Sequence, residues 1–232
     1  MFSIPFDTTD HSFCEGKAFG GPPEIINSFS SLVISLVGIH AYLKYPTAPT
    51  SQLYILFIFN GFLSFMYHYT GYLGWGIADR FTMVLIAQYS LYGFTSFVDI
   101  VCENIWTTFT IRSISSAYIL FMMVLIGLHE ETMFNGMFSL YLLFLVWYMK
   151  CMNDFQYDLE IPDRVLSRAN RGIHIMLFGG SFWILTELFC NDFTRFMMGH
   201  AFWHIAISIG GYYVSAVDVY VQKKYRNGNV LV

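Results

Sequence analysis

Two histidines four residues apart, in the stretch HAFWH at positions 200–204, are the residues of this sequence best placed to do chemistry. In a helix, His200 and His204 share one face, and this spacing lets two imidazoles bind the same metal ion. The surrounding segment, MMGHAFWHIAISIGGYYV, is otherwise apolar. The pair is also compatible with two core histidines that only have hydrogen-bond partners, so the other polar residues must decide between these interpretations.

The composition indicates that these histidines belong to a membrane protein. Of the 232 residues, 56% are hydrophobic and only 12% are charged, whereas soluble domains carry about 25% charged residues. Seven apolar segments approach the length of about 20 residues that spans a bilayer. They cover residues 25–44, 52–71, 79–98, 113–129, 134–150, 167–189 and 197–219. Short connections and the lack of repeats predict one all-α domain over residues 1–232, a bundle of seven transmembrane helices.

The distribution of Lys and Arg among the connections predicts the orientation of this bundle. A lumenal or extracellular N-terminus and a cytosolic C-terminus give the strongest excess of basic residues on the cytosolic side. The basic residues on that side are Lys44, Arg112, Lys150, Arg164, Arg168, Arg171, Lys223, Lys224 and Arg226. Those on the lumenal side are Lys17, Arg80 and Arg195. Opposite sides for the two ends also require an odd number of spans.

The four cysteines are too few for a disulfide scaffold and lack paired zinc-binding spacing. In the predicted orientation, Cys14 and Cys190 both face the lumenal, oxidising side. They form either a disulfide between the N-terminal segment and the connection between the sixth and seventh spans, or two free thiols. Cys102 and Cys151 fall on the cytosolic side and are expected to stay reduced.

Three more polar residues fall at the membrane depth of the histidine pair. His68 lies near the lumenal end of the second span, Ser64 lies one turn before it, and Asp79 opens the third span. Because a helix rises about 1.5 Å per residue, His68, His200 and His204 should lie in one leaflet. Three imidazoles with a water molecule are the ligand set of a catalytic zinc ion.

Asp79 and Ser64 each admit two interpretations. Beside a metal, the carboxylate could orient a ligating histidine or accept a proton from the attacking water, and the hydroxyl could donate to an oxyanion. Taken alone, Asp79 could cap the third helix and Ser64 could bond its own backbone. Haem ligation between helices is a further alternative, but only His68 opposes the histidine pair.

These motifs resemble those of the alkaline ceramidases, which belong to the CREST superfamily of seven-span membrane hydrolases. The similarity begins with SFMYHYT at 64–70, Asp79 eleven residues after His68, and HAFWHIAISIGGYY at 200–213. FCEGK at 13–17, PEIINSFSSLV at 23–33 and WILTELFC at 183–190 are similar to the family's tail, first span and sixth-span end. The resemblance therefore covers nearly the whole chain.

The resemblance implies a zinc-dependent amidohydrolase that cleaves ceramide into a sphingoid base and a fatty acid. It implies that zinc binds His68, His200 and His204. It also implies that Asp79 accepts a proton from the attacking water and that Ser64 stabilises the tetrahedral oxyanion. The expected partner is ceramide or a related membrane lipid, with no nucleic acid and no obligate protein partner.

The family also links its N-terminal tail to the connection between the sixth and seventh spans, which here implies a Cys14–Cys190 disulfide. We expect the protein in the endoplasmic reticulum or Golgi membrane. Two other functions stay open. A Per1-like phospholipase would use the same zinc chemistry on a lipid ester, and a non-enzymatic lipid receptor could retain the metal site.

The N-terminal segment departs from the family at a second cation site. The family holds calcium with acidic residues of its tail and first span, and Glu15 and Glu24 match these ligands. Ser12 stands where an aspartate is expected, and Lys17 where an asparagine is expected. Calcium takes several oxygen ligands and an ammonium group would repel it. We therefore expect Lys17 to pair with Glu15 or Glu24 in its place, unless Asp10 serves as a ligand.

Overall fold

The computed structural model describes residues 13–46, 48, 50–102, 105–152, 160–191 and 193–227. The regular elements in this part of the chain are helices, which confirms the all-α prediction. Seven are long: α2 (Ile25–Lys44), α3 (Ser51–Thr70), α4 (Leu73–Cys102), α5 (Ile105–Gly127), α6 (Glu131–Met152), α7 (Asp163–Leu188) and α8 (Gly199–Asn227). Two are short: α1 (Cys14–Phe19) and the 3₁₀ helix η2 (Thr194–Met197).

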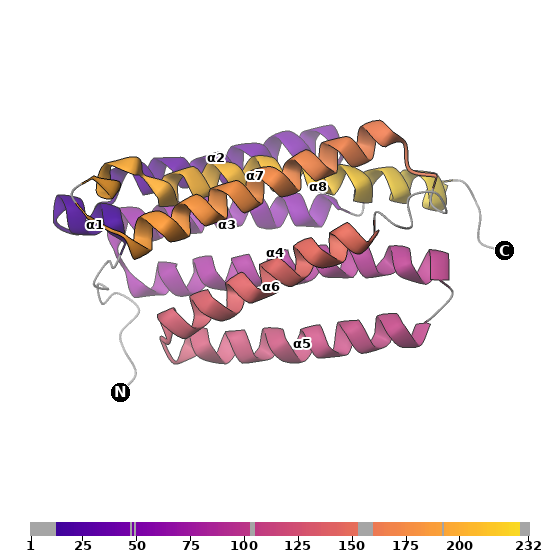
Figure 1. Cartoon of the computed structure of the whole chain (residues 1–232), viewed down its shortest axis with the longest axis horizontal. Coiled ribbons are helices and arrows are strands. Elements are labelled where there is room, and N and C mark those ends of the chain that lie inside the picture. The colour runs from indigo at the N-terminus through magenta and orange to yellow at the C-terminus, as the bar shows by residue number, and fades with distance from the viewer. Residues whose placement is uncertain are drawn as a thin grey trace.

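The long helices run roughly along one axis (Figure 1), and their contacts divide them into two groups that α4 joins. In one group, α2 packs on α3 and α8, and α8 packs on α7. In the other, α5 and α6 contact each other and α4. Helix α4 also packs on α3 and thus joins the two groups. The short helices α1 and η2 contact each other at one end of the bundle.

Glycines let the helices of the first group pack closely. A Cβ atom at Gly61 of α3 would lie 2.5 Å from the backbone nitrogen of Ser35 on α2. A Cβ atom at Gly172 of α7 would lie 2.6 Å from the carbonyl oxygen of Gly210 on α8. Small residues at such contacts allow two helix backbones to approach each other. Polar side chains on α2, α3 and α8 can therefore meet inside the bundle.

The outside of the bundle is rich in apolar side chains. Leu36, Leu120 and Leu188 are 63%, 67% and 72% exposed. Large contiguous apolar surfaces are rare on soluble monomers, so this surface suits contact with hydrocarbon. By length and composition, two segments among the described residues could cross a membrane, Ile25–Lys44 and Thr108–Gly127, and Met133–Trp147 is a shorter apolar helix. The seven-span arrangement, its orientation and the single domain over residues 1–232 stay predictions.

Helix ends differ from the predicted spans, although each span corresponds to one long helix. Helix α4 begins at Leu73, so Asp79 lies inside this helix and the helix-cap interpretation of Asp79 is wrong. Helix α8 continues to Asn227, beyond the predicted end at residue 219. Apolar length measures the part of a helix that lipid can cover, whereas turn residues such as Gly71, with φ 69° after α3, end the helix itself.

Candidate active site

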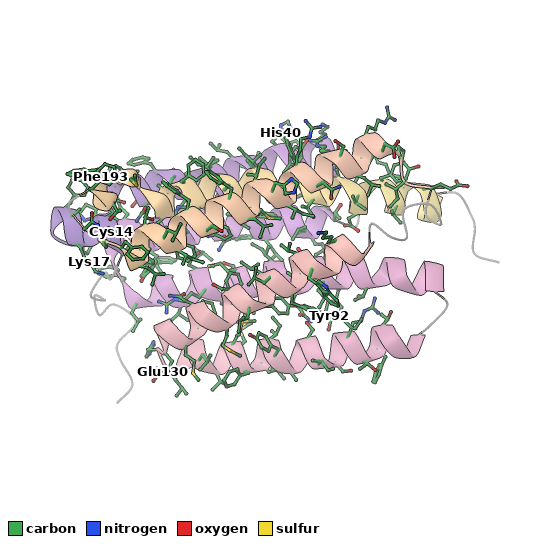
Figure 2. All side chains as sticks on the ribbon, viewed as in Figure 1. Cys14, Lys17, His40, Tyr92, Glu130 and Phe193 are labelled. Atoms are coloured by element: carbon green, nitrogen blue, oxygen red, sulfur yellow. A yellow bond between two sulfur atoms is a disulfide. The ribbon has the colours of Figure 1, made fainter. Side chains whose placement is uncertain are left out.

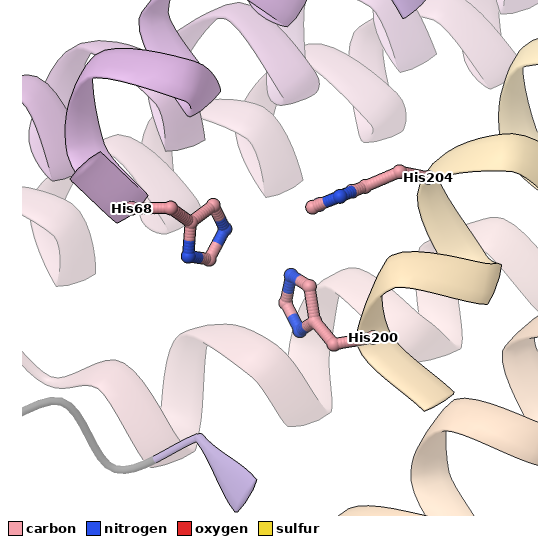
Figure 3. Close-up of side chains that lie close together, drawn as sticks. All are labelled: His68, His200 and His204. Carbon is pink, nitrogen blue, oxygen red and sulfur yellow. The ribbon is translucent and has the colours of Figure 1, made fainter. Parts of the chain in front are cut away.

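The three histidines singled out by their spacing converge in space (Figure 3). His68 comes from the last turns of α3, and His200 and His204 come from the first turns of α8. They are 1%, 8% and 4% exposed, and each offers one ligand atom that lies within 4.8 Å of the other two. Figure 3 shows His68 directing a ring nitrogen toward the two histidines of α8.

Hydrogen bonds to their Nδ1 atoms orient two of these rings. His68 Nδ1 lies 2.6 Å from Oε2 of Glu24, and a carboxylate oxygen accepts, so Nδ1 carries the proton. His204 Nδ1 lies 2.9 Å from Oγ of Ser30, whose own hydroxyl donates to the carbonyl of Asn27. His204 Nδ1 therefore donates as well. In both rings the Nε2 atom keeps its lone pair for another ligand.

His200 is held differently. Among the residues that the structure describes, its Nδ1 atom has no hydrogen-bond partner. The imidazole instead packs edge-to-face against two aromatic rings, with centroids 4.3 Å from Phe13 and 4.9 Å from Trp183. The third member of the cluster is thus oriented by ring contacts.

This donor set fits a small metal ion. Metal-binding histidines usually donate their second ring N–H to a carboxylate or another acceptor, as His68 and His204 do. Three imidazoles suit zinc and other transition metals, whereas calcium takes oxygen ligands. A haem iron would need axial histidines on opposite faces of a planar ring. Three converging rings do not provide this arrangement.

Ser64 and Asp79 line the same cavity as the three histidines, and its volume is about 280 Å³. Both residues are buried. The Ser64 hydroxyl lies 3.0 Å from that of Ser31, and Asp79 Oδ1 accepts a bond of 2.8 Å from the side-chain amide of Asn60. The structure therefore brings together the five residues that the sequence placed at one depth.

The two carboxylates predicted for a second cation have protein partners. The backbone N–H groups of Ile26 and Asn27 donate to the two oxygens of Glu15, each at 2.8 Å. Glu15 thus provides acceptors for N–H groups in the first turn of α2, which have no partner within the helix. Glu24 accepts from His68.

Glu24 Oε2 contacts His68 Nδ1 at 2.6 Å, and the pairing of Lys17 with Glu15 or Glu24 stays a prediction. Ser12 and Asp10 lie outside the described residues.

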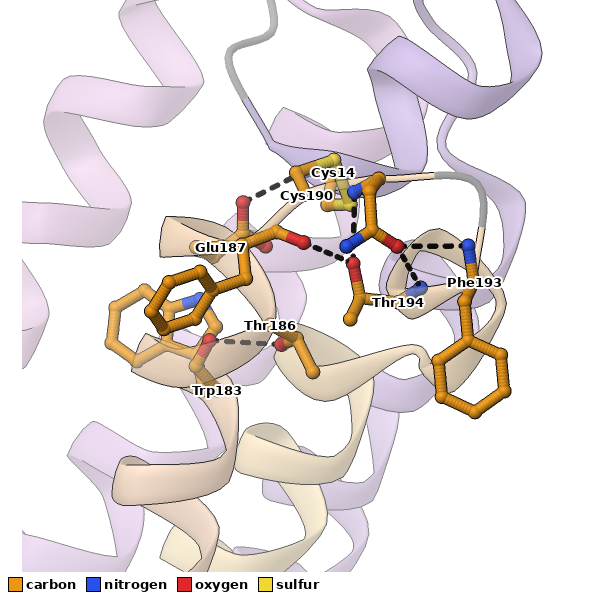
Figure 4. The surroundings of a disulfide bond; sticks show 9 residues. Cys14, Trp183, Thr186, Glu187, Cys190, Phe193 and Thr194 are labelled. Carbon is orange, nitrogen blue, oxygen red and sulfur yellow. Dashed lines mark hydrogen bonds between the residues drawn. A yellow bond between two sulfur atoms is a disulfide. The ribbon is translucent and has the colours of Figure 1, made fainter.

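A disulfide joins Cys14 to Cys190, with Cα atoms 5.6 Å apart, and decides between the two alternatives for these cysteines (Figure 4). The backbone N–H of Cys14 also donates to Oε2 of Glu187 at 2.8 Å. Helix α1 is thus fixed to the end of α7, and Cys14 and Lys17 lie at that end of the bundle (Figure 2). The side chains of Cys102 and Cys151 lie outside the described part.

Sequence reasoning missed several residues around the cluster, above all Glu24 as the partner of His68 and Asn60 as the partner of Asp79. One signal was present: Asn60, Ser64 and His68 repeat every four residues and so share one face of α3. A second signal lay at the start of α2, where Glu24, Ser28 and Ser31 follow the spacing i, i+4 and i+7 and so share one helix face.

A comparison with curated proteins returned no match. The model of the family described as Ceramidase matches residues 7–230, nearly the whole length. This match supports a hydrolase that acts on ceramide, and the cluster of three buried histidines is compatible with a bound metal ion. With this match across almost every residue, the chain belongs to the Ceramidase family.

Proposed function

We propose that this protein is a zinc-dependent intramembrane hydrolase that cleaves the amide bond of ceramide into a sphingoid base and a fatty acid. The observation that carries the proposal is the convergence of three buried imidazoles with Ser64 and Asp79 on one cavity. The Ceramidase family match supports the substrate class.

His68, His200 and His204 would hold the metal, with Glu24 and Ser30 keeping the Nε2 lone pairs of His68 and His204 available. When bound, zinc would polarise the amide carbonyl and lower the pKa of a water molecule to about 7. Apolar side chains make up much of the cavity wall, and a bound lipid chain would displace water there, which would strengthen electrostatic contacts at the site.

Asp79 is assigned as the general base. The Asn60 amide donates to Oδ1 and so fixes the plane of the carboxylate. The carboxylate would accept a proton from the attacking water and return it to the leaving nitrogen of the sphingoid base.

Ser64 is assigned as the donor to the oxyanion. Its neighbour Ser31 already donates to the carbonyl of Asn27, so the Ser31 oxygen can accept the Ser64 hydrogen at rest. Rotation of the Ser64 hydroxyl would redirect this hydrogen to the developing negative charge.

A membrane setting suits this site. The exposed apolar side chains of the long helices can contact lipid, and the Cys14–Cys190 disulfide favours an oxidising compartment at the α1 end of the bundle. We therefore propose seven spans with a lumenal N-terminus in the endoplasmic reticulum or Golgi membrane. We expect no calcium requirement, because Ser12 and Lys17 replace two expected ligands and both oxygens of Glu15 already accept backbone N–H groups of α2.

The decisive experiment measures ceramide hydrolysis and metal content of the purified protein and of His204→Ala. We expect about one zinc ion per chain and released fatty acid, both lost in His204→Ala because one of the three ligands is gone. The matched control is His174→Ala, since His174 is exposed on α7 and should be dispensable.

Wild-type protein without metal would overturn the proposal. Zinc retention with cleavage of a phospholipid ester, but of no ceramide, would assign a Per1-like phospholipase instead. Zinc retention without hydrolysis of either lipid would favour a receptor that keeps the metal site.

A further inference from the structure

We propose that Phe13 is a positioning residue whose ring, anchored by the adjacent disulfide, holds His200 in the orientation that binds metal. The inference rests on the proposed function, because it requires His68, His200 and His204 to be metal ligands. It gives the N-terminal segment a direct part in the site.

The three histidines are held in different ways. His68 and His204 are fixed by hydrogen bonds from Nδ1 to Glu24 and Ser30. No described residue bonds Nδ1 of His200, although this residue is buried. An imidazole can rotate about its χ angles unless its second nitrogen or its faces are restrained. Another contact must therefore fix His200.

Two aromatic rings provide that contact. The Phe13 ring lies 4.3 Å from His200 at an interplanar angle of 65°, and Trp183 lies 4.9 Å away at 83°. Both arrangements are edge-to-face, which aromatic pairs prefer. The Phe13 ring centroid also lies 5.3 Å from that of His68, so this side chain contacts two of the three histidines. Its ring lines the cavity.

The backbone around Phe13 is fixed by bonds to the end of α7 and to helix α1. The next residue, Cys14, is joined to Cys190 and donates its N–H to Glu187 (Figure 4). The carbonyl of Phe13 accepts the backbone N–H of Lys17 at 3.1 Å. Glu187 lies four residues after Trp183 and therefore on the same face of α7. The end of α7 thus positions both rings that contact His200.

This arrangement predicts the effect of removing the ring. Without Phe13, His200 samples orientations that do not point at the shared centre, so the site offers fewer preorganised ligands. Metal should then dissociate faster, while His68 and His204 stay in place. The faster loss of metal should follow from removing either the ring or the disulfide, and it should occur while the protein stays folded.

The test compares zinc release to an excess of chelator for wild type, Phe13→Ala, Phe13→Leu and Phe13→Tyr. We expect release about 10- to 100-fold faster for Phe13→Ala, as for other outer partners of metal ligands. Phe13→Leu keeps apolar bulk and should also release faster, whereas Phe13→Tyr keeps the ring and should restore slow release. The matched control is Phe65→Ala, because Phe65 is also half-buried but stacks on Tyr69.

The visible spectrum of the cobalt-substituted protein gives a second readout. We expect Phe13→Ala to change the ligand-field bands, because the geometry at His200 changes, and Phe65→Ala to leave them unchanged. Cys190→Ser should reproduce the effect of Phe13→Ala. Because both act on His200, the double variant should release zinc no faster than the faster single variant.

The outcomes separate this inference from the proposed function. Wild-type protein that binds no metal would overturn the proposed function and this inference with it. Wild-type protein that binds zinc and cleaves ceramide, with unchanged zinc release in both Phe13→Ala and Phe13→Leu, would overturn this inference alone. Additive effects of Phe13→Ala and Cys190→Ser would also contradict it, because the disulfide would then act elsewhere.

Discussion

Two buried carboxylates near the histidine cluster have different partners, and this difference supports the different roles proposed for them. Glu24 accepts a hydrogen bond from the Nδ1 atom of His68 and so orients the ring of that proposed metal ligand. Asp79 is bonded to Asn60 and lines the cavity, where a reacting molecule can reach it. Composition does not distinguish them, since each is one acid among sixteen. The residues that surround each carboxylate distinguish them.

Glu24→Gln tests the first of these roles. The glutamine carbonyl can still accept from His68 Nδ1, but the negative charge that makes the imidazole a better ligand is lost. We expect zinc affinity to fall about 10- to 100-fold, measured by titration of the metal-free protein against a competing chelator. Glu130→Gln is the control, because Glu130 is exposed at the turn between α5 and α6 (Figure 2). Equal zinc affinity in wild type and Glu24→Gln would contradict the role given to Glu24.

At the scale of elements, close packing of α2 on α3 connects the polar residues of the two helices. Ser31 of α2 reaches Ser64 of α3, and Glu24 reaches His68. These contacts depend on how near the two backbones come, which Gly61 permits. The positions of Ser64 and His68 relative to these partners therefore depend on the spacing of α2 and α3.

Gly61→Ala should separate these helices. The added Cβ would lie 2.5 Å from the backbone nitrogen of Ser35 and 2.8 Å from the carbonyl oxygen of Ser31, and backbone cannot turn aside as a side chain can. We expect the free energy of unfolding to fall by about 1–3 kcal/mol and ceramide hydrolysis to fall with it.

Gly136→Ala on α6 is the matched control for this change. Nothing lies within 4 Å of its added Cβ, and alanine is about 0.5–1 kcal/mol better than glycine inside a helix. Stability measured by denaturant unfolding should therefore stay equal or rise. A Gly61→Ala variant as stable and active as Gly136→Ala would show that α2 and α3 tolerate a wider spacing.

The sequence predicted the helices and the histidine cluster well, because both follow from periodicity and apolar length. Each predicted span corresponds to one helix, and residues at one calculated depth do meet. Helix ends were less predictable, as the start of α4 at Leu73 shows, since helices continue past the apolar stretch. The partners of the site were missed because they come from distant positions. Glu24 and His68 are 44 residues apart, and no local pattern connects them.

For the whole molecule, the predicted orientation can be checked directly. The natural sequence contains no Asn-x-Ser/Thr acceptor for glycosylation. We expect a chain with such an acceptor appended to its N-terminus to be glycosylated, because that end is predicted to be lumenal. The same acceptor appended to the C-terminus should stay unmodified. Gel mobility before and after glycosidase treatment distinguishes the two, and modification of the C-terminal acceptor alone would reverse the orientation.

The Cys14–Cys190 disulfide also has a consequence for how the protein is made. Its two cysteines are separated by 176 positions, which ribosomes take roughly 9 to 35 s to translate at about 5–20 residues per second. If the N-terminus is lumenal, as predicted, the thiol of Cys14 reaches the lumen during this interval, before its partner has been synthesised. The Cys14 thiol is therefore open to other pairings until Cys190, just after α7, is translated, and the histidine cluster is complete only once His204 of α8 has followed.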